Sequence, residues 1–123
     1  QPDERSYGIA DDGTTLEFML QTTHGNNYIC KMPPFFVSNA AILVRCEEIW
    51  YFLEGYGEFW LNYQNKEHFF QFQPGTSIHV PKGTPLQFKN NSEKIAIAHV
   101  VTMPPWPGAE GLELTTGPFT KKG

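Results

Sequence analysis

The sequence contains no segment with helical periodicity, and this constrains the fold more than any other feature. Its apolar residues fall in short runs rich in β-branched and aromatic types, and turn-forming residues end most of these runs. Nine such runs follow one another, at residues 14–21, 28–32, 40–46, 48–53, 58–63, 68–73, 76–80, 86–89 and 94–103. Short strands spaced about 8–12 residues apart are typical of sandwiches and barrels. The sequence therefore predicts an all-β fold of about nine strands.

The length of 123 residues is that of one domain with a buried core. We predict a single domain over residues 1–123. Residues 1–12 are polar and without a period, which predicts an N-terminal arm or tail. Residues 104–123 are rich in Gly, Pro and Thr, which predicts an irregular C-terminal tail across the surface.

The charge balance narrows the classes of partner. Nine Lys and Arg stand against 13 Asp and Glu, giving a net charge of −4. We therefore expect no nucleic acid and no anionic membrane surface as partners. The sequence has neither an apolar run of about 18 residues nor a signal peptide, and its two cysteines are too few for a disulfide framework. We expect a cytoplasmic protein with reduced thiols.

Two motifs punctuated by glycine and proline resemble those of the cupin family. The stretch EIWYFLEG from Glu48 to Gly55 resembles the second half of the first cupin motif, and GTSIHVPKG from Gly75 to Gly83 resembles the opening of the second, with Asn90 at its end. Their spacing is normal for small single-domain cupins, and the resemblance covers about residues 40–105. It implies a double-stranded β-helix, which is a jelly-roll barrel.

The same resemblance assigns a metal to two histidines of an HxH pair, to the motif glutamate and to one later histidine. Of these four ligands the chain keeps only Glu48. At the histidine positions stand Ile42 and Val44, or with the alternative spacing Ala41 and Leu43, followed by Leu86. A single carboxylate does not hold a divalent metal. We predict no metal and no other cofactor.

Glu48 is the first candidate for metal-independent chemistry. Strand alternation places Cys46, Trp50 and Phe52 on its side of the strand. A carboxyl group among these residues has a raised pKa, which suits a general acid or base. The alternative is a residual glutamate, either satisfied by hydrogen bonds to tyrosine or backbone, or turned outward beside Glu47.

His79 is a candidate for a second acid or base, since metal-independent epimerases of this fold use histidine and tyrosine for proton transfer. The alternative is a structural histidine. We place the remaining ligand-binding candidates near the same pocket. They are Arg45, Cys46, Trp50, Leu86, Phe88 and His99. Arg45 suits a carboxylate or phosphate clamp, or it pairs with a glutamate at the rim.

Too many outward strand positions are aromatic for a single domain in water. They include Tyr51, Phe59 or Trp60, and Phe69 or Phe70. An apolar face of that extent marks an interface. We expect a homodimer that packs sheet on sheet.

Two functions follow from these observations. The first is a metal-independent cupin that binds a small polar metabolite, sugar-like or a carbonyl compound, as an isomerase, epimerase or dehydratase with acid/base residues. The second is a non-catalytic ligand-binding or structural dimerising module. An interior that holds Glu48 with a histidine or tyrosine in hydrogen-bond reach, and that has an open mouth, favours the first. An interior filled by Val44, Leu86 and Phe88 favours the second.

Overall fold

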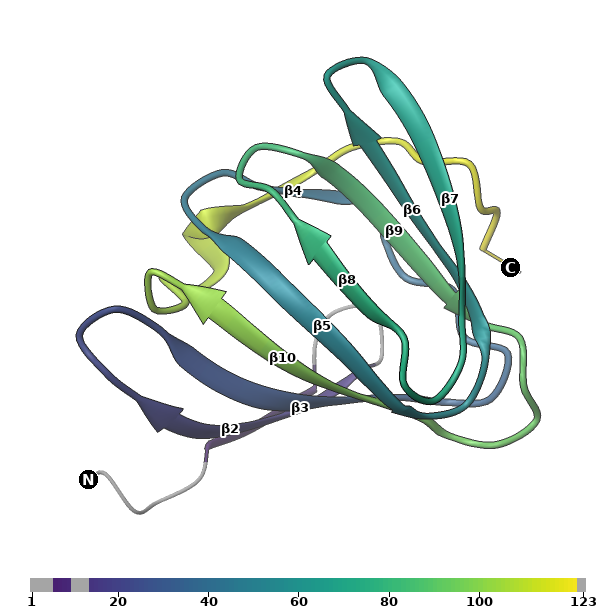
Figure 1. The fold of residues 1–123 in the computed structure, drawn as a ribbon, viewed down its shortest axis with the longest axis horizontal. Helices are drawn as coiled ribbons and strands as arrows, with labels where there is room; N and C mark the ends of the chain where they lie inside the picture. Colours follow the sequence, from purple (N-terminus) through teal and green to yellow (C-terminus); the bar gives the residue numbers. More distant parts are fainter. Residues whose placement is uncertain (1–5, 10–13, 122–123) are drawn as a thin grey trace.

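The computed structural model describes residues 6–9 and 14–121 and consists of two antiparallel sheets that face each other (Figure 1). The first sheet has six strands in the order β1 (Ser6–Ile9), β2 (Thr15–Gln21), β3 (Asn26–Met32), β10 (Ala96–Met103), β5 (Glu47–Glu54) and β8 (Ser77–Val80). The second has five in the order β11 (Leu112–Leu114), β4 (Ala41–Leu43), β9 (Pro85–Asn90), β6 (Gly57–Tyr63) and β7 (Lys66–Phe72). The all-β jelly roll expected from the sequence is confirmed.

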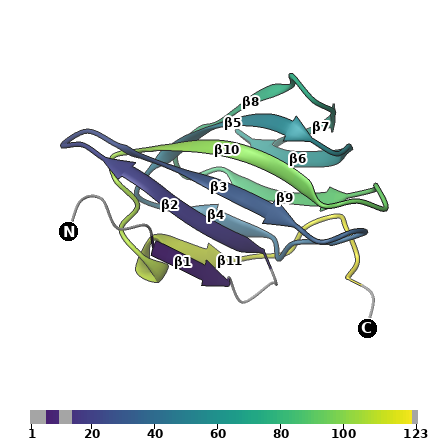
Figure 2. The same cartoon turned by 90° about the horizontal axis from the view of Figure 1, so that it is seen from below.

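All nine predicted runs contain a strand, from β2 to β10, and two short strands lie outside them. Strand β1 lies within the predicted arm 1–12 and pairs with β2, so that β1 is the edge strand of the sheet; the other residues of that arm fall outside the described part of the chain. Strand β11 corrects the prediction that residues 104–123 are wholly irregular, because Leu112–Leu114 pairs with β4. A three-residue strand has no readable period, so the sequence did not reveal it. Figure 2 shows both short strands from below.

The core between the sheets is aromatic around Phe52. The ring of Phe52 stacks on that of Phe72 with centroids 3.9 Å apart, and the Trp50 ring meets those of Phe59 and Phe88 at 5.2 and 5.0 Å. Aromatic pairs at such separations add stability beyond the area they bury. This cluster fills the barrel on one side of Trp50, while Glu48 lies on the other side along β5.

The motif glycines terminate the strands that carry the site. Gly55 has a φ of +91°, and a Cβ atom there would lie 2.5 Å from the Cβ of Ala96. Only glycine fits this turn, because the backbone is left-handed and the neighbouring strand is too close. The turn reverses the chain after β5, so that β6 joins the opposite sheet.

The C-terminal segment crosses the outer face of the five-stranded sheet. The side chain of Gln87 accepts a hydrogen bond from the Phe119 amide at 2.9 Å and donates one to the Phe119 carbonyl at 2.9 Å. The Trp60 indole lies under the same segment and donates to Glu67 at 2.9 Å. Trp60 therefore points outward but is buried by this segment, whereas Phe59 lies in the core between the sheets, so neither leaves an exposed aromatic surface. None of the helical turns in the described ranges is long and apolar enough to cross a membrane.

Candidate functional site

A cavity of about 140 Å³ lies between the two sheets beside Glu48. Its wall combines inward side chains of both sheets with residues from the C-terminal segment. The lining residues are Thr14, Leu16, Tyr28, Cys30, Ala41, Leu43, Glu48, Trp50, Leu86, Phe88, Trp106 and Leu112. The wall is mostly aliphatic and aromatic, and among these described residues Glu48 is the only carboxylate.

Glu48 is held by three hydrogen bonds from three neighbouring side chains. Its Oε2 accepts from the Tyr28 hydroxyl at 3.0 Å and from the Thr102 hydroxyl at 2.8 Å. Its Oε1 accepts from the Trp50 indole at 3.0 Å. Only 2% of the residue is exposed. A buried carboxyl group is costly without partners, and these three donors supply them.

The register of the six-stranded sheet brings these donors together. Thr102 on β10 lies directly opposite Glu48 on β5, so the two side chains point to the same face. Tyr28 on β3 lies opposite Val100 on β10, one strand further away. Its long side chain reaches across to the carboxyl group.

Burial raises the pKa of Glu48 above its ordinary value, and the hydrogen bonds from Thr102, Trp50 and Tyr28 offset part of that rise. Burial, with the Glu48 charge nearby, raises the pKa of Tyr28 well above its ordinary value. Tyr28 therefore stays a neutral donor, while Glu48 is the group of this pair that exchanges its proton more readily. Glu48 therefore points inward and is hydrogen-bonded to tyrosine, so the outward placement beside Glu47 is wrong, whereas the acid/base role and the residual role both stay predictions.

The cavity identifies which spacing of the family's ligand positions applies. Ala41, Leu43 and Leu86 line it with Glu48, whereas Ile42 and Val44 do not. Ala41 and Leu86 are direct partners across β4 and β9. Over the described ranges, no group of three or more His, Cys, Asp or Glu side chains is placed to hold a metal ion. One carboxylate among aliphatic residues does not fit the metal that the family implies.

Trp50, Leu86 and Phe88 meet Glu48 at the cavity as predicted, but Cys46 does not line it. Cys46 is buried beyond the wall, and burial raises its thiol pKa to about 11. It therefore remains a neutral thiol near pH 7. Arg45 is exposed in the turn before β5 and forms no ion pair with the described residues, so it clamps nothing in the cavity.

The two candidate histidines lie on the outer face of the six-stranded sheet. His79 is flanked on β8 by the buried Ile78 and Val80, and strand alternation turns it outward. There its Nε2 lies 2.7 Å from Oε1 of Glu47. His99 alternates in the same way with buried residues of β10, and its Nε2 lies 3.0 Å from Nδ2 of Asn27. Neither histidine is brought to Glu48.

The sequence analysis missed Tyr28, Thr102 and Trp106. Each is separated from Glu48 by at least 20 positions, and their meeting depends on β3, β10 and β5 being neighbours. The backbone amide of Trp106 donates to Oδ1 of Asn26 at 2.7 Å, and this bond fixes the segment that closes the cavity. Alternation on the last strand does place Thr102 on the buried side, which is the one signal that was available.

Comparisons with known proteins agree with this architecture. A family model of the cupin domain matches residues 45–102, whereas no curated protein matches the chain. TT1209 from Thermus thermophilus is similar with a TM-score of 0.67 at 18% identity, over 80% of this chain and 90% of that chain. CENP-C from Drosophila melanogaster, bound to CAL1, gives 0.70 at 13% identity, over 83% and 84%.

A third similar structure is the capsular polysaccharide assembling protein CapF from Staphylococcus aureus, with a TM-score of 0.70 at 10% identity. The match covers 89% of this chain but 34% of CapF. At identities this low the likeness concerns the fold alone. The two motifs, the paired sheets and the matched residues 45–102 together show that this chain has the cupin jelly-roll fold.

Proposed function

We propose that this protein is a metal-independent cupin that binds a small carbonyl compound in the cavity and moves a proton with Glu48. The supporting observation is the placement of Glu48 as the only carboxylate among the described residues of an otherwise apolar wall, within 3.0 Å of the Tyr28 hydroxyl. This combination of a carboxyl group and a tyrosine in hydrogen-bond reach is the arrangement that favours an enzyme over an inert barrel.

The proposed step needs no oxidant and no metal. The Glu48 carboxylate accepts a proton from a carbon next to the carbonyl, the C–H electron pair forms a C=C bond, and the C=O π pair moves onto the oxygen, which gives an enolate beside protonated Glu48. Transfer of that proton to the oxygen gives the enol and restores the carboxylate. From the enolate, protonated Glu48 returns the proton to the same carbon or to a conjugated one, so that atoms and charge balance. The raised pKa of Glu48 makes its carboxylate a stronger base for the first half of this transfer.

A carbonyl compound suits the cavity better than a sugar. Each hydroxyl of a sugar needs a hydrogen-bond partner once it leaves water, and an unpaired one costs about 1–3 kcal/mol. The polar lining is confined to a few side chains around Glu48, and the rest is Leu, Ala, Phe and Trp. A molecule with one polar group gives up the fewest hydrogen bonds to water, so it loses the least free energy when it enters the cavity.

The test is hydrogen exchange in D₂O, followed by NMR on a panel of small cyclic and acyclic ketones. We expect the wild type to exchange protons next to the carbonyl and Glu48→Gln to lose about 10²–10⁴-fold in rate. The Gln side chain keeps the local packing: its oxygen accepts from Trp50 and its amide donates to the hydroxyls of Tyr28 and Thr102. Equal rates in the two proteins, or no exchange on any ketone, would contradict the proposal.

The second candidate is a non-catalytic binding or dimerising module. Its support is the aliphatic character of Ala41, Leu43 and Leu86, which adds no reactive group. CENP-C, crystallised in complex with CAL1, shares the fold. Binding of ketones without Glu48-dependent exchange would identify this function.

We also propose that the protein forms a homodimer through the outer face of the six-stranded sheet. Ile49, Tyr51 and Leu53 of β5 are 42%, 45% and 43% exposed. Val101 of β10 lies opposite Ile49 and extends this apolar surface. A contiguous apolar surface with a polar rim is typical of an interface.

The rim supports a second copy as the occupant. Lys31 pairs with Glu17 at 2.9 Å on one side of the face, and His79 pairs with Glu47 at 2.7 Å on the other. A twofold axis through the face lets the Lys31 side of one copy meet the Glu47 side of the other, so opposite charges approach.

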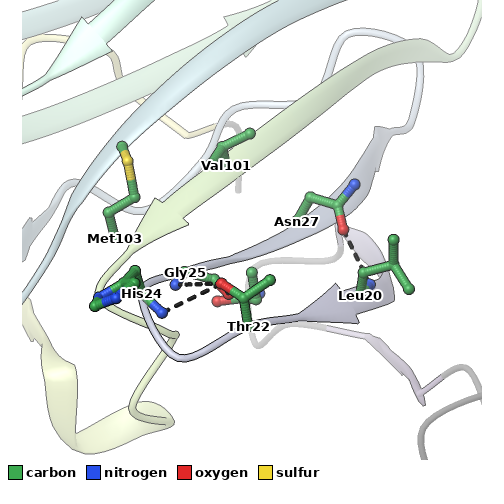
Figure 3. Close-up of a pocket in the computed structure, with 8 residues that line it drawn as sticks. Leu20, Thr22, His24, Gly25, Asn27, Val101 and Met103 are labelled. Atoms are coloured by element: carbon green, nitrogen blue, oxygen red, sulfur yellow. Dashed lines mark hydrogen bonds between the residues drawn. The ribbon is translucent and has the colours of Figure 1, made fainter.

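An open hollow of about 390 Å³ adjoins this face at the β2–β3 turn (Figure 3). Leu20, Val101 and Met103 form its apolar wall, and the Thr22 hydroxyl, which accepts from the Gly25 amide at 3.2 Å, holds the turn. A side chain projecting from a second copy fills such a depression without displacing the sheet.

We expect Tyr51→Lys to convert the dimer to a monomer in light scattering after gel filtration, because the twofold axis places two buried ammonium groups in one interface. Tyr56→Lys is the matched control, since Tyr56 is 56% exposed in the turn between β5 and β6. A wild-type monomer, or equal loss of dimer in both variants, would reject this interface.

The cytoplasm is the compartment that we propose. Two cysteines are too few for a disulfide framework, and this agrees with a reducing environment.

A further inference from the structure

The cavity has the size of one ring. Its volume is about 140 Å³. An apolar protein cavity of about 150 Å³ holds one benzene molecule. The space beside Glu48 therefore accommodates a single six-membered ring with a small substituent, and it is too small for a bicyclic compound or a nucleotide.

The wall has the shape and chemistry that a ring prefers. Tyr28, Trp50, Phe88 and Trp106 all contribute aromatic surface to it. Aromatic side chains attract a flat ring through offset or edge-on contacts, in addition to the effect of excluding water. The aliphatic side chains of Leu43 and Leu86 complete the wall.

The polar end offers one position for a hydrogen-bond donor. Oε2 of Glu48 already accepts two hydrogen bonds, from Tyr28 and Thr102. Oε1 accepts one, from Trp50. A carboxylate oxygen has two lone pairs, so Oε1 retains the capacity for one further donor.

The charge of the wall excludes an anion. No Lys, Arg or His is among the described residues that line it. A carboxylate or phosphate in the cavity would face Glu48 with no cation to compensate it. The single donor must therefore belong to a group that carries no negative charge.

We propose that the ligand is a neutral six-membered ring with one hydroxyl group, as in a phenol or a cyclic enol, and that this hydroxyl donates to Oε1 of Glu48. The proposal rests on the proposed function, because it takes the cavity beside Glu48 as the binding site. It narrows the substrate to cyclic ketones whose enol has this shape.

The experiment compares phenol, benzene and benzoate by ligand-observed NMR titration of the purified protein. We expect phenol to bind about 10- to 100-fold more tightly than benzene, since a hydrogen bond to a charged group contributes that much. Benzoate, which has the same ring, is expected not to bind. Equal affinity for phenol and benzene, or tighter binding of benzoate, would overturn the proposal.

A cavity-filling variant locates the binding. Leu86→Phe places a larger side chain in the wall and is expected to abolish phenol binding, while Ile95→Phe, at an exposed position between β9 and β10, leaves it unchanged. Loss of binding in both variants, or in neither, would place phenol elsewhere and overturn the assignment. Circular dichroism and the unfolding midpoint confirm that each variant is folded.

The two proposals fail in different ways. Phenol binding that Leu86→Phe abolishes, without Glu48-dependent exchange on any ketone, would support the ring site and reject the catalytic function. Glu48-dependent exchange on acyclic ketones alone, with no phenol binding, would reject the ring site and support the catalytic function. Neither binding nor exchange would reject both.

Discussion

Histidines introduced together at positions 41, 43 and 86 are expected to create a metal site in the cavity. Ala41 and Leu86 are direct cross-strand partners, Leu43 lies two positions along the same face of β4, and Glu48 faces them from the other sheet. The triple variant Ala41→His, Leu43→His and Leu86→His then offers three imidazoles and one carboxylate around one space. That donor set suits Mn, Fe, Ni or Zn.

The expected result is one equivalent of metal by elemental analysis and a higher melting temperature when metal is added. A metal at 100 times its dissociation constant stabilises the native state by about 2.7 kcal/mol. The wild type, with one carboxylate, is expected to show neither change. We expect the stabilisation by metal to be large because all four donors bind the same ion.

The sequence supplies a matched control for this experiment. The variant Ile42→His, Val44→His and Leu86→His adds the same number of histidines in the alternative spacing. Ile42 and Val44 do not line the cavity, so this variant is expected to bind less than stoichiometric metal. Equal loading of the two variants would contradict the assignment of Ala41 and Leu43 as the inward positions.

The second large effect is a fall in stability with rising pH that depends on Glu48. Burial raises the folded-state pKa of Glu48 above its unfolded value of about 4.5. In the window between these two values the native state binds more protons than the unfolded state, so the free energy of unfolding decreases as pH rises. The stabilisation is complete below about pH 4.5 and is lost as pH passes through the folded-state pKa.

The measurement is urea unfolding of the wild type and Glu48→Gln at several pH values, followed by tryptophan fluorescence. The wild type is expected to lose stability relative to Glu48→Gln with a slope of up to about 1.4 kcal/mol per pH unit within the window. Glu47→Gln is the control, because Glu47 is partly exposed and its surface pair with His79 contributes little. Parallel curves for the wild type and Glu48→Gln would show that Glu48 does not titrate in this way.

Local patterns predicted the strands and the inward direction of Glu48. Alternation along β5 requires only the neighbours of Glu48, and it placed Trp50 and Phe52 correctly on the buried side. The glycine and proline turns marked the ends of the longer strands, because a left-handed backbone such as that of Gly55 restricts the residue type. Each of these signals is carried by a few neighbouring residues, so it can be recognised in a single sequence.

The composition of the site depends on contacts that no local pattern encodes. Tyr28 reaches Glu48 because β3 lies beside β10, and Thr102 because its register places it opposite. His79 was misplaced for a different reason. Alternation with Ile78 and Val80 already indicated an outward histidine, but its proximity to the second motif was given more weight.

The burial of Trp60 illustrates the same limit for surfaces. Strand alternation predicts which side chains point away from the barrel interior, but it does not predict which other segments of the chain cover them. The C-terminal segment crosses this face. Its Phe119 backbone is hydrogen-bonded to the side chain of Gln87, which lies 32 positions earlier in the chain. Counting outward aromatics therefore overestimated the free apolar surface of the five-stranded sheet.

Different parts of the cavity wall determine the affinity of a ligand and its residence time. Trp106 and Leu112 close the cavity from a segment fixed by the three-residue pairing of β11 with β4 and by the bond to Asn26. Short pairings open far more often than the core of a sheet. We therefore expect opening of this segment to change the rate at which a ligand leaves the cavity, whereas the affinity of the ligand depends on Glu48 and the rings around it. Substitutions in β11 change residence time, and substitutions at Glu48 change equilibrium occupancy.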